Sequence, residues 1–301
     1  MAKTKSKPKV APAPTLRYTK PARSCADLLT HLKSRGLSIP NEQEATEALE
    51  RISYYRLLIY FRALQDRTTK AFMPGKTFKD ALDLYSFDRK LRLLCLDAIE
   101  RIEVSLRAAI NNTICVTQGP HFYLERANFN SSENYRDFMQ RAMRPRYLGV
   151  RHYQEKYIEP GLPPFWAVAE GITFGDLSKL YSGLIPVHQK VIAKNFNGYD
   201  YERLASWFKA LNYLRNVCAH HNRLWNFGML VDRPQESKAL PELINNHKFY
   251  ARAVLLVALL AVVEPGNGWR DRLVKLIDEY PRIPTNEMGF PPNWRMLTFW
   301  M

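Results

Sequence analysis

The chain has 301 residues, enough for one large domain or two small ones, and its apolar and aromatic content is that of a folded protein. Its net charge of +15 favours a polyanionic partner, either nucleic acid or an anionic membrane surface. The four cysteines are widely spaced and form no C-x-x-C pair, which argues against a disulfide framework or a zinc ribbon and fits a reducing cytosol. The N-terminus has no apolar h-region, so we expect no signal peptide.

The charge is concentrated at the N-terminus. Residues 1–23 contain seven Lys or Arg, four Pro and no acidic residue, a composition that cannot bury apolar area. We therefore predict a flexible basic arm, which serves either as a solubilising tail or as a contact for RNA. The remaining residues carry a net charge near +8, fifteen minus seven, and are therefore still basic.

Helical periodicity dominates the rest of the chain. Beyond the arm it predicts helices over residues 24–35, 42–65 (with Asn41 as N-cap), 78–116, 133–143, 151–158, 166–171, 176–183, 200–226, 246–263 and 269–279. An irregular tail rich in Pro and Gly is expected from Pro281 onward. Alternating strand patterns are essentially absent, so we predict a single all-α domain over 24–301, built on packed long helices.

The most apolar run, Ala253–Val263, is too short to span a bilayer, which takes roughly 20 residues. It is typical of a buried core helix. We therefore expect a soluble, cytoplasmic protein that has no membrane partner.

The segment from Leu211 to Asn226 combines a helical apolar face with basic residues and histidines. On a regular helix Arg215 and Asn222 share the apolar face, where a polar side chain must be paired or open onto a cleft. His220 lies about 140° round from Arg215, and His221 about 120° on the other side. The long arginine side chain, a distorted helix end or a second copy of the helix must therefore bring Arg215 and a histidine together.

An arginine with a histidine suits RNA cleavage by the 2′-hydroxyl. The histidine can take or give the proton, and the guanidinium can hold the phosphate and stabilise developing charge, with no metal or cofactor. The alternative is structural: Arg215 pairs with Glu100 or Glu103, and His220 is a surface residue. Cys218, His220 and His221 are too close together on a helix for a tetrahedral metal site, so we expect no bound metal.

The segment Arg215-Asn-Val-Cys-Ala-His220 resembles the R-x4–6-H signature of HEPN-type ribonucleases, with a polar residue after the arginine. The surrounding chain resembles bacterial abortive-infection proteins of the AbiD/AbiF type from about residue 17 to the end. The matching stretches, in family order, are Ile52–Leu57, Arg101–Arg107, Pro163–Trp166, Phe174–Tyr181, His220–Asn226 and Met288–Trp294.

This resemblance implies a HEPN-like bundle and RNA cleavage that halts growth of infected cells, in a phage-defence or toxin–antitoxin system. It also implies a relation to the nuclease part of type VI CRISPR effectors and neutralisation by a partner RNA or protein. In that reading Arg215 holds the scissile phosphate, His220 is the general base or acid, and Asn216 orients them. Whether His220 or His221 faces the phosphate is not decided by helix geometry.

One position departs from the family pattern. Many relatives have a histidine about six residues after the arginine that corresponds to Arg107, whereas this chain has Thr113 there, after Asn111 and Asn112. The chain thus has one intact motif. Because such sites are commonly built from two facing motifs, we expect a two-fold homodimer that pairs Arg215 and His220 with their copies.

A second basic region runs from Arg136 to Lys156, where basic residues alternate with tyrosines and a phenylalanine. This pattern suits single-stranded RNA, through phosphate pairing and base stacking, but also fits a solvated helix with its aromatic side chains turned inward. The candidate RNA-binding residues are Arg141, Arg144, Arg146, Arg151, His152, His221, Asn222 and Arg223.

Two other functions remain open on the sequence. The same residues could form a non-catalytic module that holds a structured regulatory RNA. The chain could also be a protein-interaction scaffold that senses a phage component.

Overall fold

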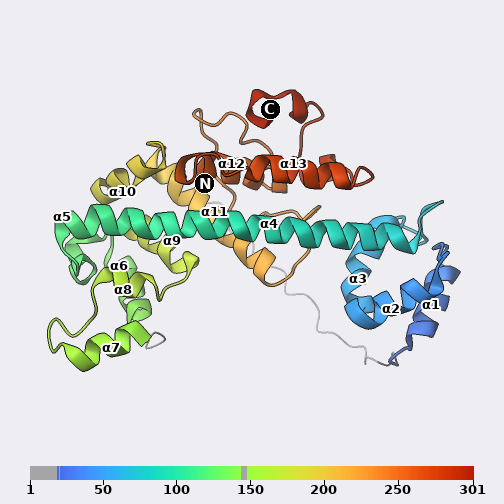
Figure 1. The fold of residues 1–301 in the computed structure, drawn as a ribbon, viewed down its shortest axis with the longest axis horizontal. Helices are drawn as coiled ribbons and strands as arrows, with labels where there is room; N and C mark the ends of the chain where they lie inside the picture. Colours follow the sequence, from blue (N-terminus) through green and yellow to red (C-terminus); the bar gives the residue numbers. More distant parts are fainter. Residues whose placement is uncertain (1–18, 20, 144–147) are drawn as a thin grey trace, which may run out of the picture. The chain divides into compact units, whose positions relative to one another are not determined.

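A computed structural model describes residue 19, residues 21–143 and residues 148–301 (Figure 1). Within these residues the regular structure is helical and the β-type pairing is limited to isolated bridges, so the predicted all-α class is confirmed. The predicted basic arm lies outside the described residues except for residues 19 and 21–23. Two compact units, residues 1–81 and 82–301, divide the chain inside the long helix α4 (Phe78–Ile110). Because α4 continues through the boundary, the single domain over 24–301 stays a prediction.

The first unit contains three short helices. They are α1 (Cys25–Ser34), α2 (Glu42–Ile52) and α3 (Tyr54–Phe61). Asn41 is the N-cap of α2, as predicted, because its side chain accepts a hydrogen bond from the Glu44 backbone N–H. The continuous helix predicted over 42–65 is wrong, since Ser53 adopts φ +69° and ψ 148° between α2 and α3. The Ser53 hydroxyl then caps α3 by accepting from the Arg56 N–H.

The second unit holds the remaining helices. After α4 come a π-helical turn (Asn111–Cys115), α5 (Val116–Gln118), α6 (Ser132–Ala142), α7 (Leu148–Lys156), α8 (Phe165–Ala169), α9 (Phe174–Gly183), α10 (Pro186–Ala193), α11 (Tyr201–Ala219), α12 (Phe249–Val263) and α13 (Trp269–Glu279). Sequence periodicity missed α10, which begins with Pro186 at its first position. It also extended α11 seven residues too far.

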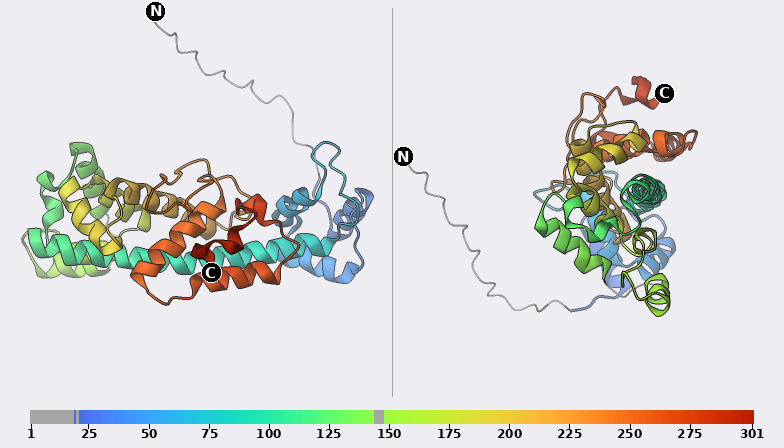
Figure 2. Two further views of the ribbon diagram at one scale, coloured as in Figure 1. Left: turned by 90° about the horizontal axis from the view of Figure 1, so that it is seen from above. Right: turned by 90° about the vertical axis from the view of Figure 1, so that its left-hand side faces the viewer.

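The core of this unit forms where α12 and α13 run alongside the part of α4 after Leu82 (Figures 1 and 2). The helix α12 is apolar nearly all round and almost fully buried, as predicted for Ala253–Val263. The indole Nε1–H of buried Trp269, on α13, donates to the Leu94 carbonyl of α4 over 2.8 Å. None of the described helices is long and apolar enough to span a bilayer.

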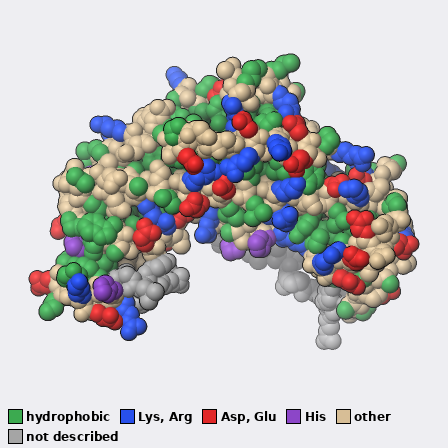
Figure 3. Space-filling view, viewed as in Figure 1, with side chains coloured by type: hydrophobic (Ala, Val, Ile, Leu, Met, Phe, Trp, Pro, Cys, Tyr) green, Lys and Arg blue, Asp and Glu red, His purple; other side chains and the backbone are tan. Residues whose placement is uncertain are grey.

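Salt bridges line the outer edge of this packing. Asp97 on α4 pairs with Arg101 and with Arg272 of α13, and Arg101 also reaches Glu264 over 2.7 Å. Figure 3 accordingly shows acidic and basic side chains interspersed along α4 and α13. Because these charges neutralise one another, this face offers no continuous basic surface to a nucleic acid.

The left-handed backbone at Ser53 gives a stability prediction. We expect Ser53→Gly to stabilise the protein by about 1 kcal/mol, because glycine relieves the strain of this conformation while losing only a few tenths from the cap. Thermal or urea unfolding measures the change.

Ser53→Ala is the matched control. It removes the cap and keeps the strained backbone, so it should destabilise the protein by about 1 kcal/mol. A glycine variant that is less stable than the alanine variant would contradict the backbone strain assigned to Ser53.

Candidate functional site

The predicted motif lies at the C-terminal end of α11. Asp200 caps the start of this helix, and Leu204, Trp207 and Leu211 form its buried face. Arg215 and Asn216 are half-buried in its last turn, whereas His220 is exposed at its end. The guanidinium of Arg215 lies 3.4 Å from the Asn216 side-chain oxygen.

The helix ends in a Schellman turn. His220 is the C-cap, and His221 adopts the left-handed conformation with φ +57°. The His221 N–H donates to the Cys218 carbonyl over 3.0 Å, and the Asn222 N–H donates to the Val217 carbonyl over 2.9 Å. Histidine is among the residues that tolerate this conformation. Asn222 therefore leaves the helix and is exposed, so its predicted place on the apolar face of α11 is wrong.

A buried ion pair on α4 fixes the turn after α11. Asp88 is fully buried and binds Arg92, one helical turn on, at 2.5 Å. The carboxylate of Asp88 also accepts the backbone N–H groups of Leu224 and Trp225 over 3.0 and 2.7 Å. Arg92 in turn donates to the Asn222 carbonyl over 3.2 Å. We call Asp88 and Arg92 the α4 brace; it ties the segment that carries the two histidines to the core.

The cysteines reinforce this junction. Cys95 on α4 and Cys218 on α11 are both buried. Burial, together with the neighbouring Cys218 thiol, holds the pKa of Cys95 well above its ordinary value. Cys95 is therefore a protonated packing group. Among the described residues no three His, Cys, Asp or Glu side chains cluster as metal ligands.

Arg215 faces charged groups of α4. Glu103 pairs with Arg107 over 2.5 Å, and Arg107 also donates to the Ile172 carbonyl over 3.1 Å. Burial raises the pKa of Glu103, while the positive charges of Arg107 and Arg215 oppose that rise. The structural alternative expected for Arg215 thus has support, because Arg215 lies within electrostatic range of Glu103. No direct ion pair joins them among the described residues.

Arg215 and His220 do not bond to each other in the described structure. The His220 N–H still donates to the Asn216 carbonyl over 3.0 Å, so the chain keeps its helical course through His220. The distortion begins only at His221 and cannot close the expected angle of about 140°. Asn216 lies about 40° from His220 on the same side of α11 and contacts Arg215, so it lies between them.

A π-helical turn, Asn111–Cys115, occupies the position where relatives are expected to have a second histidine. The hydroxyl of Thr113 donates to the Ala109 carbonyl over 2.6 Å, and the Asn111 side chain accepts from the Cys115 thiol. Asn112 is exposed. The turn begins four residues after Arg107, and π-turns inside helices are frequent at functional sites.

The other predicted RNA-binding residues differ in their surroundings. Arg141 is held by Asp137 and by Asp176, the latter over 2.7 Å. Arg151 is exposed and pairs with Glu155, and His152 is exposed. Arg223 is half-buried. Arg144 and Arg146 lie outside the described residues.

The aromatic side chains of this region divide between the two expected arrangements. Phe138 is buried, and Tyr135 is half-buried with its hydroxyl bonded to the Leu124 carbonyl. Tyr157 is exposed, and its ring lies 4.7 Å from that of Tyr153. Phe138 of α6 is therefore turned inward, whereas Tyr157, which follows α7, is exposed.

Comparison with known proteins gives the family. The model of the Abi-like protein family matches residues 47–226, more than half of the chain. The chain belongs to the Abi-like protein family. No curated protein and no solved structure matches it. The match ends at Asn226, so it includes the whole of α11 and the turn held by the α4 brace. Membership points to abortive-infection defence as the broad role of the protein.

Little in the residue pattern indicates the α4 brace. Asp88 and Arg92 are spaced four residues apart, which predicts a helical ion pair, but such pairs are usually on the surface. Their position beside Phe87 and Leu91 in the apolar stripe is the one signal of burial. The partners are backbone groups some 130 residues away, which no side-chain pattern reveals.

We expect Asp88→Ala to destabilise the protein by about 3–5 kcal/mol, because it removes the buried carboxylate that binds Arg92 and the acceptor of two backbone N–H groups. Urea unfolding measures the loss. Asp97→Ala, which breaks exposed ion pairs on the same helix, should cost about 1 kcal/mol or less. Equal losses of stability in the two variants would contradict the larger contribution assigned to the buried α4 brace.

Asp176 gives a pH prediction. Burial raises its pKa, but hydrogen bonds from Arg141 and Thr173 outweigh burial and lower it below the ordinary 3.8. A lowered carboxyl pKa contributes stability above about pH 4 that is lost as the pH falls toward the folded-state value. Asp176→Asn should therefore lose less stability than wild type between pH 5 and pH 3. An unchanged slope of unfolding free energy against pH would contradict this.

Proposed function

We propose that this protein is a metal-independent endoribonuclease toxin of phage defence, acting in the cytoplasm on RNA. The half-buried Arg215 in the last turn of α11 and the exposed His220 at its end, next to a turn fixed by the α4 brace, carry the proposal. An always-charged guanidinium and a solvent-accessible imidazole are the two groups that transesterification of RNA needs.

In the proposed reaction Arg215 binds the scissile phosphate and stabilises its transition-state charge. His220 takes the 2′-hydroxyl proton or protonates the leaving 5′-oxygen, and the products carry a 2′,3′-cyclic phosphate and a 5′-hydroxyl. Asn216 contacts Arg215 and lies on the same side of α11 as His220, so it orients the two. No cofactor takes part.

A second copy of the chain completes this site. Because α11 stays regular through His220, one copy directs Arg215 and His220 to different sides. A two-fold axis beside the end of α11 would bring the His220 of one copy to the Arg215 of the other. Sedimentation should give about twice the chain mass of 35.1 kDa.

His220 is preferred over His221 as the catalytic histidine. His220 continues the face of α11 that carries Asn216, whereas the left-handed backbone of His221 turns its side chain away from that face. The family spacing also favours His220. The exposed His221, Asn222 and the half-buried Arg223 then contact the RNA backbone next to the cleaved bond.

The test is cleavage of a labelled mixed RNA by purified protein in excess EDTA. We expect wild type to cut and leave cyclic-phosphate ends, and Arg215→Ala and His220→Ala to lose about 10²–10⁴-fold in rate. His221→Ala should keep most of the activity.

Lys275→Ala removes an exposed charge on α13 and is the matched control for lost basic charge. Salt-sensitive RNA binding without cutting, unchanged in Arg215→Ala and His220→Ala, would instead favour the non-catalytic RNA-binding module. Loss of activity in His221→Ala but not in His220→Ala would reverse the assignment of the histidine.

A further inference from the structure

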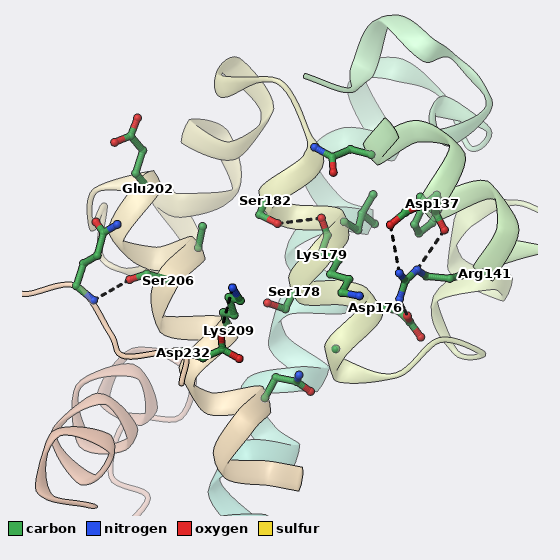
Figure 4. A pocket seen from close by; sticks show the side chains of 17 residues that line it. Asp137, Arg141, Asp176, Ser178, Lys179, Ser182, Glu202, Ser206, Lys209 and Asp232 are labelled. Carbon is green, nitrogen blue, oxygen red and sulfur yellow. Dashed lines mark hydrogen bonds and ion pairs between the residues drawn. The ribbon is translucent and has the colours of Figure 1, made fainter. Parts of the chain in front are cut away.

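A polar groove lies between α6, α9 and α11, beside the proposed site. Its volume is about 540 Å³, within the range of about 300–1,000 Å³ that is usual for small-molecule sites. Figure 4 shows Asp137 and Arg141 on one side and Ser206, Lys209 and Asp232 on the other, with Ser178 and Lys179 of α9 between them.

The charges around the groove nearly cancel. Four carboxylates line it (Asp137, Asp176, Glu202 and Asp232) against three basic side chains (Arg141, Lys179 and Lys209). Arg141 is paired with Asp176 over 2.7 Å, and Lys209 with Asp232 over 3.0 Å. A phosphate gains little in such a place, whereas a neutral group with several hydrogen-bonding atoms is well matched.

Two polar groups in the groove are free to bind such a ligand. The Asn212 amide is half-buried and has no hydrogen-bond partner among the described residues, and the exposed Lys179 ammonium has no acidic partner there. A Cβ on Gly175 would lie 3.1 Å from the Asn212 side-chain oxygen, so the glycine leaves room for this amide. Phe138 and Leu180 also line the groove, but both side chains are buried.

The walls of the groove are held in place. Arg252 on α12 is fully buried and donates to the carbonyls of Met229 and Asp232, each over 3.3 Å. Burial lowers the pKa of Arg252 to about 10, so it stays charged at neutral pH. The opposite wall is fixed by the pairing of Arg141 with Asp176. The groove is therefore formed before a ligand arrives, which reduces the ordering cost of binding.

The groove residue Lys209 shares one face of α11 with Asn216 and His220 of the motif. At 100° per residue Lys209, Asn216 and His220 lie within about 40° of one another. Asn212 precedes His220 by eight residues, a rise of about 12 Å. A few nucleotides of single-stranded RNA cover that distance.

We propose that this groove binds one base of single-stranded RNA close to the cleaved bond. The Asn212 amide oxygen and the Glu202 carboxylate have no basic partner among the described residues, and as acceptors they favour a base with an exocyclic amino group (adenine, cytosine or guanine) over uracil. This inference rests on RNA being the ligand of the proposed function and adds a base preference to it.

The test measures affinity, not cleavage. The His220→Ala protein is titrated with labelled 10-mers of A, C or U at one fixed salt concentration. We expect oligo(U) to bind about five- to tenfold more weakly than the other two, and Asn212→Ala to remove most of that difference. Each variant meets the same oligonucleotides, so differences in base stacking cancel.

Lys179→Ala is the second variant, because an exposed side chain can be removed without unfolding the protein. It should weaken binding of all three 10-mers more than its control, Lys275→Ala. The proposal would be overturned if oligo(U) still bound more weakly by the same factor in Asn212→Ala, and if Lys179→Ala bound all three 10-mers as tightly as Lys275→Ala does.

Two further arms identify a different occupant. In the first, free AMP competes with oligo(A) at equal base concentration in the wild-type groove but not in Asn212→Ala. That result would assign the groove to free nucleotides and overturn the RNA proposal. A Lys/Arg-rich decapeptide whose affinity depends on Asp137 and Glu202, with RNA affinity independent of the groove, would make it a peptide site. If wild type cuts no RNA but the base preference depends on Asn212, the groove stands and the nuclease proposal fails.

Discussion

The geometry of the candidate site depends on one buried ion pair, Asp88 with Arg92. Isolated charges are costly to bury, and this pair is tolerated because its remaining hydrogen-bonding capacity is used on backbone groups of the turn after α11. The same bonds that satisfy the pair fix the position of that turn. A surface salt bridge could not do this, since water would compete for both partners.

The helix α11 links two places of different chemistry. Its end carries a half-buried arginine and an exposed histidine, and its middle forms one wall of a nearly neutral groove. A phosphodiester chain needs positive charge, while a base needs hydrogen-bonding atoms. The division of these features along one helix matches the two parts of a nucleotide.

Glu103 is a half-buried carboxylate near Arg215. Its pKa is raised by burial even though two arginines lie near, so the ionised carboxylate is poorly solvated. Under the proposed function, a phosphate bound by Arg215 would compete with Glu103 for the same positive charge. The carboxylate thus keeps the arginine from being an uncompensated charge on α11, without pairing with it directly.

The sequence by itself determined the helical class, most of the helices and the motif. Apolar spacing of three and four residues persists along α4 and α12, and five of the six family stretches lie within residues 47–226, which the family model matches. Local chemistry also predicted the Asn41 cap. It did not predict the break at Ser53. The break is caused by a positive φ angle at this serine, and the apolar spacing of the segment does not indicate such an angle.

Only the tertiary structure decided where α11 ends and what surrounds Arg215. The periodic pattern continues past His220, but the N–H groups of Leu224 and Trp225 bind Asp88 in place of carbonyls of a continued helix. The groove likewise joins residues from three helices and a loop held by Arg252. Such contacts depend on how distant segments pack, and residue spacing within one segment contains no information about them.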